Sequence, residues 1–236
     1  KNAKILSADL AASLQSITFE IPPGQGRLNS VRVVVGSDVT NIGSRVDSLI
    51  RITYAPPILV SPTSGEKTVS NSAGYDLVNT GVGPKLATSG GLVRMFGTNL
   101  GVLGTVELRG GSLSSSILLS IVAWGHSEIL FEVPSGYGSD YRVVLEVGGQ
   151  VATSDMFRYE TPVVSSYTMV LSRRRLGSTK TGGTRGGDRI AVIGTGFFTT
   201  GTATIGGVNC VVVSCNHTSL VLETPIGAGA DNPLVV

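Results

Sequence analysis

The phrase "ITFEIPPGQG" at Ile17–Gly26 recurs as "ILFEVPSGYG" at Ile129–Gly138 and as "LVLETPIGAG" at Leu220–Gly229. Before the Pro of each copy, apolar side chains alternate with Ser, Thr, Leu or Glu, as in a strand that covers one side of a core. The Pro ends the strand because it has no N–H, and the glycines permit a tight turn. Alternating runs follow the first two copies, at Ser30–Gly36 and Tyr141–Gly149. Each copy therefore predicts a β-hairpin.

The three copies lie at similar intervals along the chain, and other matches lie between them. The phrase recurs 112 positions after Pro22, at Pro134, and 91 positions later at Pro225. This spacing is typical of immunoglobulin-sized sandwiches. In one further match, a strand that begins with Gly-Gly leads into a Gly-x-x turn, as in "GGLVRMFGTNLG" (90–101) and "GGDRIAVIGTGFFTTG" (186–201). In another, a strand runs into a Pro, as in "ITYAPPILVSP" (52–62) and "FRYETPVVSSY" (157–167).

The order of these matches predicts an all-β chain of tandem immunoglobulin-like sandwiches with incomplete units at both ends. Residues 1–54 match the C-terminal part of a unit, residues 55–160 match a complete unit, and residues 161–236 match a unit that lacks its final strand. The Gly-, Ser- and Thr-rich stretch 66–89 has no clear period and predicts a long surface loop or an additional edge hairpin.

Composition limits the classes of partner. Only 14% of the 236 residues are charged, and the net charge of +2 is too small for the dense basic face that nucleic acid requires. No apolar run approaches the roughly 18 to 20 residues of a membrane span. The sequence begins at Lys1 without a Met or a signal peptide, which predicts either a processed chain or a segment of a longer one.

Four ordered elements together resemble the IPT/TIG family of immunoglobulin-like domains. They are a Pro-led first strand, a Gly-Gly strand ending in Gly-x-x-Phe, a Gly-Gly-x-x-Cys turn and a Thr-Pro-x-Gly segment, seen in "PPILVSPTSG", "GGLVRMFGTNLG", "GGVNCVVVSCNHTSLVLETPIGAG" and "FRYETP". The resemblance extends over nearly the whole chain and implies a cell-surface location, as in many relatives. Leu222 stands where many family members have a second Cys, so the family's cross-sheet cysteine pair is not implied here.

Two arrangements would accommodate the incomplete units. A sandwich without its final strand exposes backbone on an edge and favours pairing with another chain. The strand in "LIRITYAPP" (49–57) is of the type that the last unit lacks, which makes Leu49, Ile50, Ile52 and Tyr54 a candidate interchain strand. Residues 5–36, however, repeat strands that the last unit already has. The other arrangement is a segment of a longer array, and both predict head-to-tail assembly.

Cys210 and Cys215 match no metal or redox spacing. On one straight strand they would point to opposite faces, so a disulfide between them requires a turn; the alternative is two small buried apolar side chains. Asn216 begins the only Asn-x-Ser/Thr sequon, a candidate glycosylation site if the chain is secreted.

The sequence predicts no catalysis, no cofactor and no metal site. It contains no nucleophile elbow, Walker loop, zinc-binding helix or acidic calcium loop, and its glycine-rich phrases precede strands rather than helices. The two histidines, His126 and His217, are interpreted as polar turn residues. Glu20, Glu132 and Glu223 occupy the same place in the three phrases and point away from the apolar face, so solvent exposure or cross-strand pairing explains them.

The segment 172–185 carries five basic residues without a carboxylate before Asp188: Arg173, Arg174, Arg175, Lys180 and Arg185. This loop is a candidate contact for an acidic glycan or neighbour, a site for a basic-site protease, or a solvated loop. Trp124, Tyr137 and Tyr141 are the candidates for stacking on a sugar, with Trp124 expected to pack in a core or at an edge.

These observations favour a non-enzymatic extracellular structural protein, a subunit or segment of a surface filament, stalk or appendage whose main partners are other copies of itself. The alternative is an adhesin or receptor ectodomain whose loops bind a protein or a glycan. Function is inferred here from fold and location.

Overall fold

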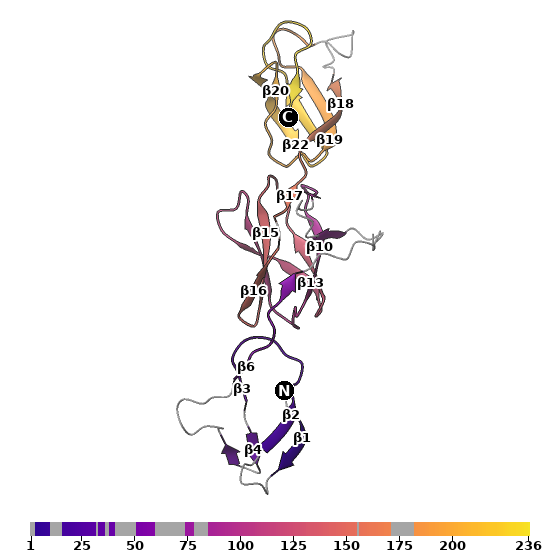
Figure 1. Ribbon diagram of the computed structural model, residues 1–236. Helices are drawn as coiled ribbons and strands as arrows, with labels where there is room; N and C mark the ends of the chain where they lie inside the picture. Colours follow the sequence, from indigo (N-terminus) through magenta and orange to yellow (C-terminus); the bar gives the residue numbers. More distant parts are fainter. Residues whose placement is uncertain are drawn as a thin grey trace.

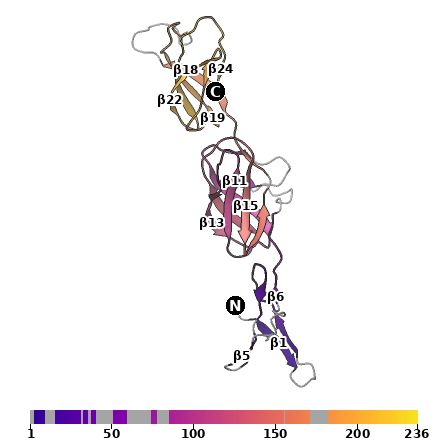
Figure 2. The same ribbon diagram turned by 90° about the vertical axis from the view of Figure 1, so that its left-hand side faces the viewer.

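The computed structural model describes residues 3–9, 16–31, 33–35, 38–40, 51–59, 74–77, 85–154, 156–170 and 182–236. All regular structure in these ranges is β-strand, which confirms the all-β prediction. No helix in the described part of the chain is long and apolar enough to cross a membrane. Figures 1 and 2 show three groups of strands in chain order along one long axis.

The middle group, here called the central sandwich, places two sheets face to face. One sheet has the order β13-β14-β10-β7, with β8 added parallel to β10, and the other has the order β12-β11-β15-β16. The strands of the first sheet are β7 (Ile58–Leu59), β8 (Gly74–Leu77), β10 (Gly91–Thr98), β13 (Ser120–Trp124) and β14 (Glu128–Val133). Those of the second are β11 (Thr105–Gly110), β12 (Ile117–Leu118), β15 (Tyr141–Val147) and β16 (Gln150–Thr153).

A short parallel pair closes the same sandwich, formed by β9 (Lys85–Leu86) and β17 (Arg158–Tyr159). Strands β8 and β9 fall inside the stretch 66–89 for which a loop or an edge hairpin was predicted. Because each of the two strands pairs with a strand outside that stretch, they do not form a hairpin with each other.

The core of the central sandwich follows the predicted alternation. Ile129, Phe131 and Val133 of β14 are buried, whereas Glu132 between them is exposed. The ring of Tyr141 stacks on Phe157 with centroids 5.6 Å apart. Burying a side chain of this size stabilises a fold by about 1.5–3 kcal/mol, so these residues contribute much of the free energy that stabilises the central sandwich.

The last group, the C-terminal sandwich, repeats this plan in shorter form. Its first sheet has the order β18-β19-β23-β22 and its second has the order β21-β20-β24. Its core contains Val192, Phe197, Leu220 and Leu222. The strands are β18 (Val163–Val170), β19 (Arg189–Thr195), β20 (Thr204–Ile205), β21 (Val208–Asn209), β22 (Val211–Cys215), β23 (Ser219–Glu223) and β24 (Leu234–Val235).

The first group is called the N-terminal strands. Among its described residues three pairs occur: β1 (Lys4–Asp9) with β2 (Ser16–Glu20), β3 (Asn29–Ser30) with β6 (Arg51–Ile52), and β4 (Val33–Val35) with β5 (Asp38–Thr40). Here the apolar face of the phrase is open to solvent, since Ile17 and Ile21 are 37% and 50% exposed.

The hairpin prediction for the repeated phrase is wrong. Strand β14 belongs to one sheet and β15 to the other, and β23 and β24 are divided in the same way. The phrase therefore carries the chain across the sandwich from sheet to sheet. The turns at Gly110-Gly111 and Gly206-Gly207, in contrast, do join paired antiparallel strands.

Candidate functional site: the junctions between units

The crossover phrase is held by a tyrosine from the end of the same unit. In the central sandwich the Tyr159 hydroxyl donates a hydrogen bond to the Pro134 carbonyl at 2.8 Å, and the Tyr159 N–H donates to the Gly138 carbonyl at 2.9 Å. The ring lies directly beneath Gly136, where a Cβ would be 2.5 Å from ring carbons. Only glycine fits this position. Burial raises the pKa of Tyr159, and the nearby Tyr141 adds to the shift.

The N-terminal strands repeat these contacts. The Tyr54 hydroxyl donates to the Pro22 carbonyl at 2.7 Å, its N–H donates to the Gly26 carbonyl at 3.0 Å, and its ring lies beneath Gly24. The backbone after each copy of the phrase also repeats, with left-handed residues at the last glycine and two positions later: Gly26, Gly138 and Gly229 at φ 93°, 88° and 100°, and Leu28, Asp140 and Asp231 at φ 56°, 69° and 56°. The phrase is thus a rigid crossover that presents one side chain, the one between its two glycines.

In the central sandwich that side chain is Tyr137, which contacts the C-terminal sandwich. Its ring centroid lies 5.0 Å from that of Phe198, and the Phe198 ring meets the His217 imidazole edge-on at 6.0 Å. Beside this cluster the buried Thr88 hydroxyl donates to the Phe197 carbonyl at 2.7 Å and lies 2.9 Å from Nδ1 of His217. Aromatic contact and hydrogen bonding together fix the C-terminal sandwich on the end of the central one.

In the N-terminal strands the corresponding side chain is Gln25, which contacts the central sandwich. Its Oε1 accepts from the Val102 N–H at 2.7 Å and from the Leu103 N–H at 3.3 Å, while its Nε2 donates to the Leu103 carbonyl at 2.6 Å. Nearby, the Gln150 amide donates to the Tyr54 carbonyl at 3.1 Å. This junction is polar, whereas the one at Tyr137 is aromatic.

Both junctions use the same two segments of the unit. Gln25 and Tyr137 hold the same place in the phrase. They dock on the loops 99–104 and 196–201, each of which follows the strand that begins after the Gly-Gly motif. The two histidines also correspond, since the His126 and His217 carbonyls accept hydrogen bonds from Leu100 and Phe197 in these loops. The same docking geometry therefore occurs twice in the chain, once with the hydrogen bonds of Gln25 and once with the aromatic contact of Tyr137.

A cleft of about 510 Å³ lies beside the aromatic junction. Its lining includes the buried apolar side chains of Tyr159, Phe197 and Leu220, together with Arg158 and Glu160. Cys215 also lines it.

Both cysteines are free thiols, so the candidate disulfide is not formed. Cys215 donates through Sγ to the Phe198 carbonyl at 2.6 Å, and Cys210 packs against the core of the C-terminal sandwich. Burial raises the pKa of both thiols. Both cysteine side chains are partly buried.

The other predicted site residues are dispersed. Asn216 is exposed, with Oδ1 accepting from the backbone N–H groups of Thr218 and Ser219, and Arg185 is exposed in a turn. Arg173, Arg174, Arg175 and Lys180 lie outside the described residues. No group of three or more His, Cys, Asp or Glu side chains suited to a metal ion occurs in the described ranges.

Of the three aromatic candidates for sugar stacking, only Tyr137 is exposed. Tyr141 is buried in the core, and the Trp124 indole is half-buried and donates to the Leu100 carbonyl at 2.9 Å. Trp124 is thus a packing residue, as expected.

The candidate interchain strand is occupied within its own chain in its described part. Ile52 pairs with Asn29, and Tyr54 makes the contacts with the phrase given above. Leu49 and Ile50 lie outside the described residues.

Sequence reasoning did not predict the junction role of Gln25, Tyr137, Thr88 and His217, although it named Tyr137 as a stacking candidate and His217 as a turn residue. Repeat position was the available signal, because Gln25 and Tyr137 stand between equivalent glycines and both histidines precede an equivalent strand.

Residues 177–236 match the family model of the IPT/TIG domain. No curated protein matches the chain. The plexin A4 extracellular region is 17% identical, with a TM-score of 0.27, and the match covers 64% of this chain and 15% of plexin. A surface glycan-binding protein from Prevotella bryantii is 11% identical with a TM-score of 0.36, and the match covers 78% of this chain and 40% of that one.

A surface glycan-binding protein from the mixed-linkage glucan utilisation locus of Bacteroides ovatus, solved with a mixed-linkage heptasaccharide, is 16% identical with a TM-score of 0.24. That match covers 95% of this chain and 61% of the Bacteroides protein. The chain thus spans less than two thirds of each of these three structures.

Proposed function

We propose that this chain, whose residues 177–236 match the IPT/TIG family model, is a non-enzymatic extracellular structural protein. In this proposal it is a repeating segment of a surface filament, stalk or appendage, with units at 1–54, 55–160 and 161–236 arranged head to tail. Its role is to hold an end of the assembly at a fixed distance, which requires that successive units do not swivel.

The observation that carries the proposal is the repeated docking of the crossover phrase on the loop of the next unit. A flexible array needs only a linker, whereas here Gln25 makes three hydrogen bonds across one junction. Tyr137 and Thr88 supply the corresponding contacts at the other. Relative motion is the default between domains of one chain, and the contacts at these two junctions oppose it. Restricted motion is the property of a spacer.

Two measurements test this function. Antibody against the chain should label intact cells as strongly as permeabilised ones, and cryo-electron microscopy of the labelled material should show units stacked along an axis. Labelling that requires permeabilisation would contradict the extracellular location. Labelled surface material in which the units show no axial order would contradict the structural role.

A binding role is the second candidate, favoured by the exposure of Tyr137 and by the five basic residues of segment 172–185. For an acidic glycan, replacing Arg173, Arg174 and Arg175 with Ser should remove retention on heparin at low salt, where exposed cationic side chains are little screened and attract the sulfate groups most strongly. Unchanged elution would leave the solvated loop as the explanation.

A further inference from the structure

The side chain that each crossover phrase presents lies against the same position in the loop of the next unit. The segments that contain the two loops have equal length and similar ends, since 97–104 reads "GTNLGVLG" and 194–201 reads "GTGFFTTG". Gly101 and Phe198 therefore hold the same place. Gln25 lies against Gly101, and Tyr137 lies against Phe198. The polar junction thus joins a Gln to a Gly, whereas the aromatic junction joins a Tyr to a Phe.

At the polar junction, only a residue without a side chain fits opposite Gln25. A Cβ on Gly101 would collide with Oε1 of Gln25 and lie 2.6 Å from Cγ1 of Val147. Gly101 also has a φ of 69°, in the left-handed region that favours glycine. Because this space is free, the Gln25 amide reaches the backbone of Val102 and Leu103 and makes the three hydrogen bonds described above.

At the aromatic junction, the ring of Phe198 takes the place that is free at Gly101. Its centroid lies 5.0 Å from that of Tyr137, at an interplanar angle of 48°. Two aromatic rings at this separation attract each other. An amide at the position of Tyr137 would instead bring polar groups against an apolar ring, which costs free energy unless the amide finds hydrogen-bond partners.

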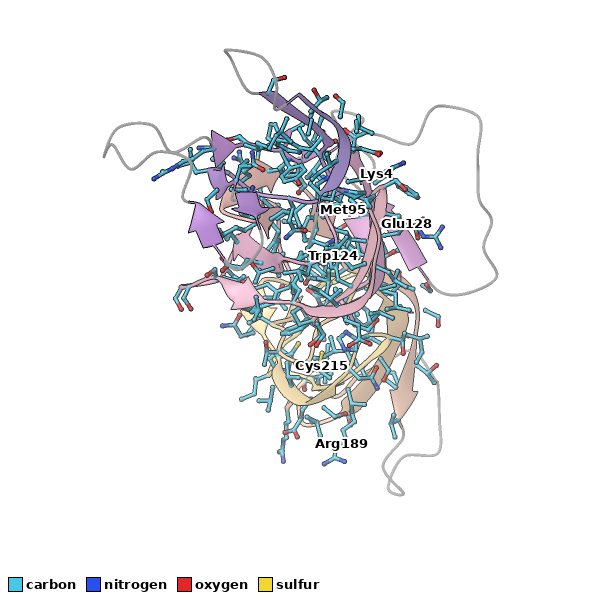
Figure 3. All side chains as sticks on the ribbon, turned by 90° about the horizontal axis from the view of Figure 1, so that it is seen from below. Lys4, Met95, Trp124, Glu128, Arg189 and Cys215 are labelled. Atoms are coloured by element: carbon cyan, nitrogen blue, oxygen red, sulfur yellow. The ribbon has the colours of Figure 1, made fainter. Side chains whose placement is uncertain are left out.

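Each loop is also fixed by a side chain of its own sandwich. The Trp124 indole donates to the Leu100 carbonyl at 2.9 Å, and the Cys215 thiol donates to the Phe198 carbonyl at 2.6 Å. Trp124 and Cys215 are the last residues of β13 and β22, and Figure 3 labels both side chains. A loop held in this way resists rearrangement around a poorly matching side chain.

We propose that the two facing positions form a matched pair that selects which unit docks on which. A phrase with Gln fits a loop with Gly opposite it, and a phrase with Tyr fits a loop with an aromatic ring opposite it. A tyrosine against Gly101 would overlap the loop, because the shorter Gln25 already touches the loop backbone; this is the repulsive element that specificity requires. The proposal rests on the docking contacts that carry the spacer role, and adds that neighbouring units are not interchangeable.

The first test transfers the Gln–Gly pair to the aromatic junction. Tyr137→Gln and Phe198→Gly each break the Tyr–Phe pair, and the double variant contains the pair of the polar junction. Thr199 and Thr200 hold the places of the two residues whose N–H groups donate to Gln25. In the double variant these two threonine amides should exchange hydrogen about tenfold more slowly than in Phe198→Gly, because the new glutamine accepts from them. Phe198→Gly is the matched control, since it has the same loop without that glutamine.

The second test uses the polar junction and leaves the C-terminal sandwich unchanged. Gln25→Ala removes the contact, whereas Gln25→Tyr also places a ring against Gly101. We expect the amides of Val102 and Leu103 to exchange severalfold faster in Gln25→Tyr than in Gln25→Ala, because the ring pushes the two units apart. This comparison decides the proposal if the double variant of the aromatic junction does not fold.

Two results would overturn the proposal. One is a folded double variant whose two threonine amides exchange as fast as in Phe198→Gly; the other is equal exchange at the polar junction in Gln25→Ala and Gln25→Tyr. The spacer role fails separately. A broad distribution of distances between spin labels on the exposed Val151 and Val208 of the otherwise unchanged junctions would contradict that role, even where the double variant shows the slowed exchange.

Discussion

At the scale of single residues, Tyr159 and Gly136 show how the repeated phrase keeps its shape. The ring occupies the space that any side chain at 136 would need, and the hydroxyl satisfies the Pro134 carbonyl at the point where the strand stops. Tyr54 and Gly24 do the same in the N-terminal strands. The phrase recurs because one crossover needs one set of residues.

Tyr159 also makes the central sandwich sensitive to alkali. Its pKa is raised in the folded chain, so below pH 10 both states hold the proton and the full stability is present. Above pH 10 the unfolded tyrosine ionises first, and stability falls with rising pH. Tyr159→Phe should cost about 1 kcal/mol at neutral pH through the lost hydrogen bond and should flatten the alkaline decline.

Urea unfolding followed by the fluorescence of Trp124 checks this, because the single tryptophan reports on the central sandwich alone. Tyr167→Phe in β18 is the matched control and should leave this unfolding curve unchanged. An alkaline decline as steep in Tyr159→Phe as in the parent would exclude Tyr159 as its source.

At the scale of elements, the strands were predictable and their partners were not. Alternation is local, so Ile129, Phe131 and Val133 could be placed on a buried face from the sequence. The choice of sheet is not local. A Pro followed by two glycines is compatible with a crossover and with a hairpin, and the pairing of β15 with β11 decides between them. That is why the hairpin prediction failed.

The pairing of strands β18 and β19 depends on Gly194. A Cβ at this position would collide with the Val163 carbonyl on the neighbouring strand, whereas Gly201 has open space. Gly194→Ala should therefore destabilise the C-terminal sandwich by about 1–3 kcal/mol, and Gly201→Ala should change it little.

Both cysteines lie in the C-terminal sandwich, so their reactivity towards a thiol reagent in increasing urea measures its unfolding. Equal midpoints for the two alanine variants would mean that β18 moves aside without cost.

At the scale of the whole molecule, the account depends on junctions that do not swivel. The polar junction can be tested through Gln25, because Val102 and Leu103 both donate to its amide oxygen. Gln25→Ala should accelerate hydrogen exchange at these two amides by about tenfold, the equivalent of one hydrogen bond. Exchange as slow as in the parent would show that Gln25 does not hold this junction.

The junction residues also show what could not be predicted from the sequence. His217 is indistinguishable from a solvated turn residue until the neighbouring unit brings Thr88 within 2.9 Å of it. Such contacts depend on how one unit sits on the next, and no pattern within a unit reports that.

The most direct test is the distance distribution across the aromatic junction. Spin labels at V151C on β16 and V208C on β21, both exposed positions, would be placed in a Cys210→Ser, Cys215→Ser background and measured by pulsed electron paramagnetic resonance. The account predicts a single narrow distance that broadens when Tyr137→Gly and Thr88→Ala remove the contacts. A distribution already broad in the parent, and unchanged in the double variant, would contradict it.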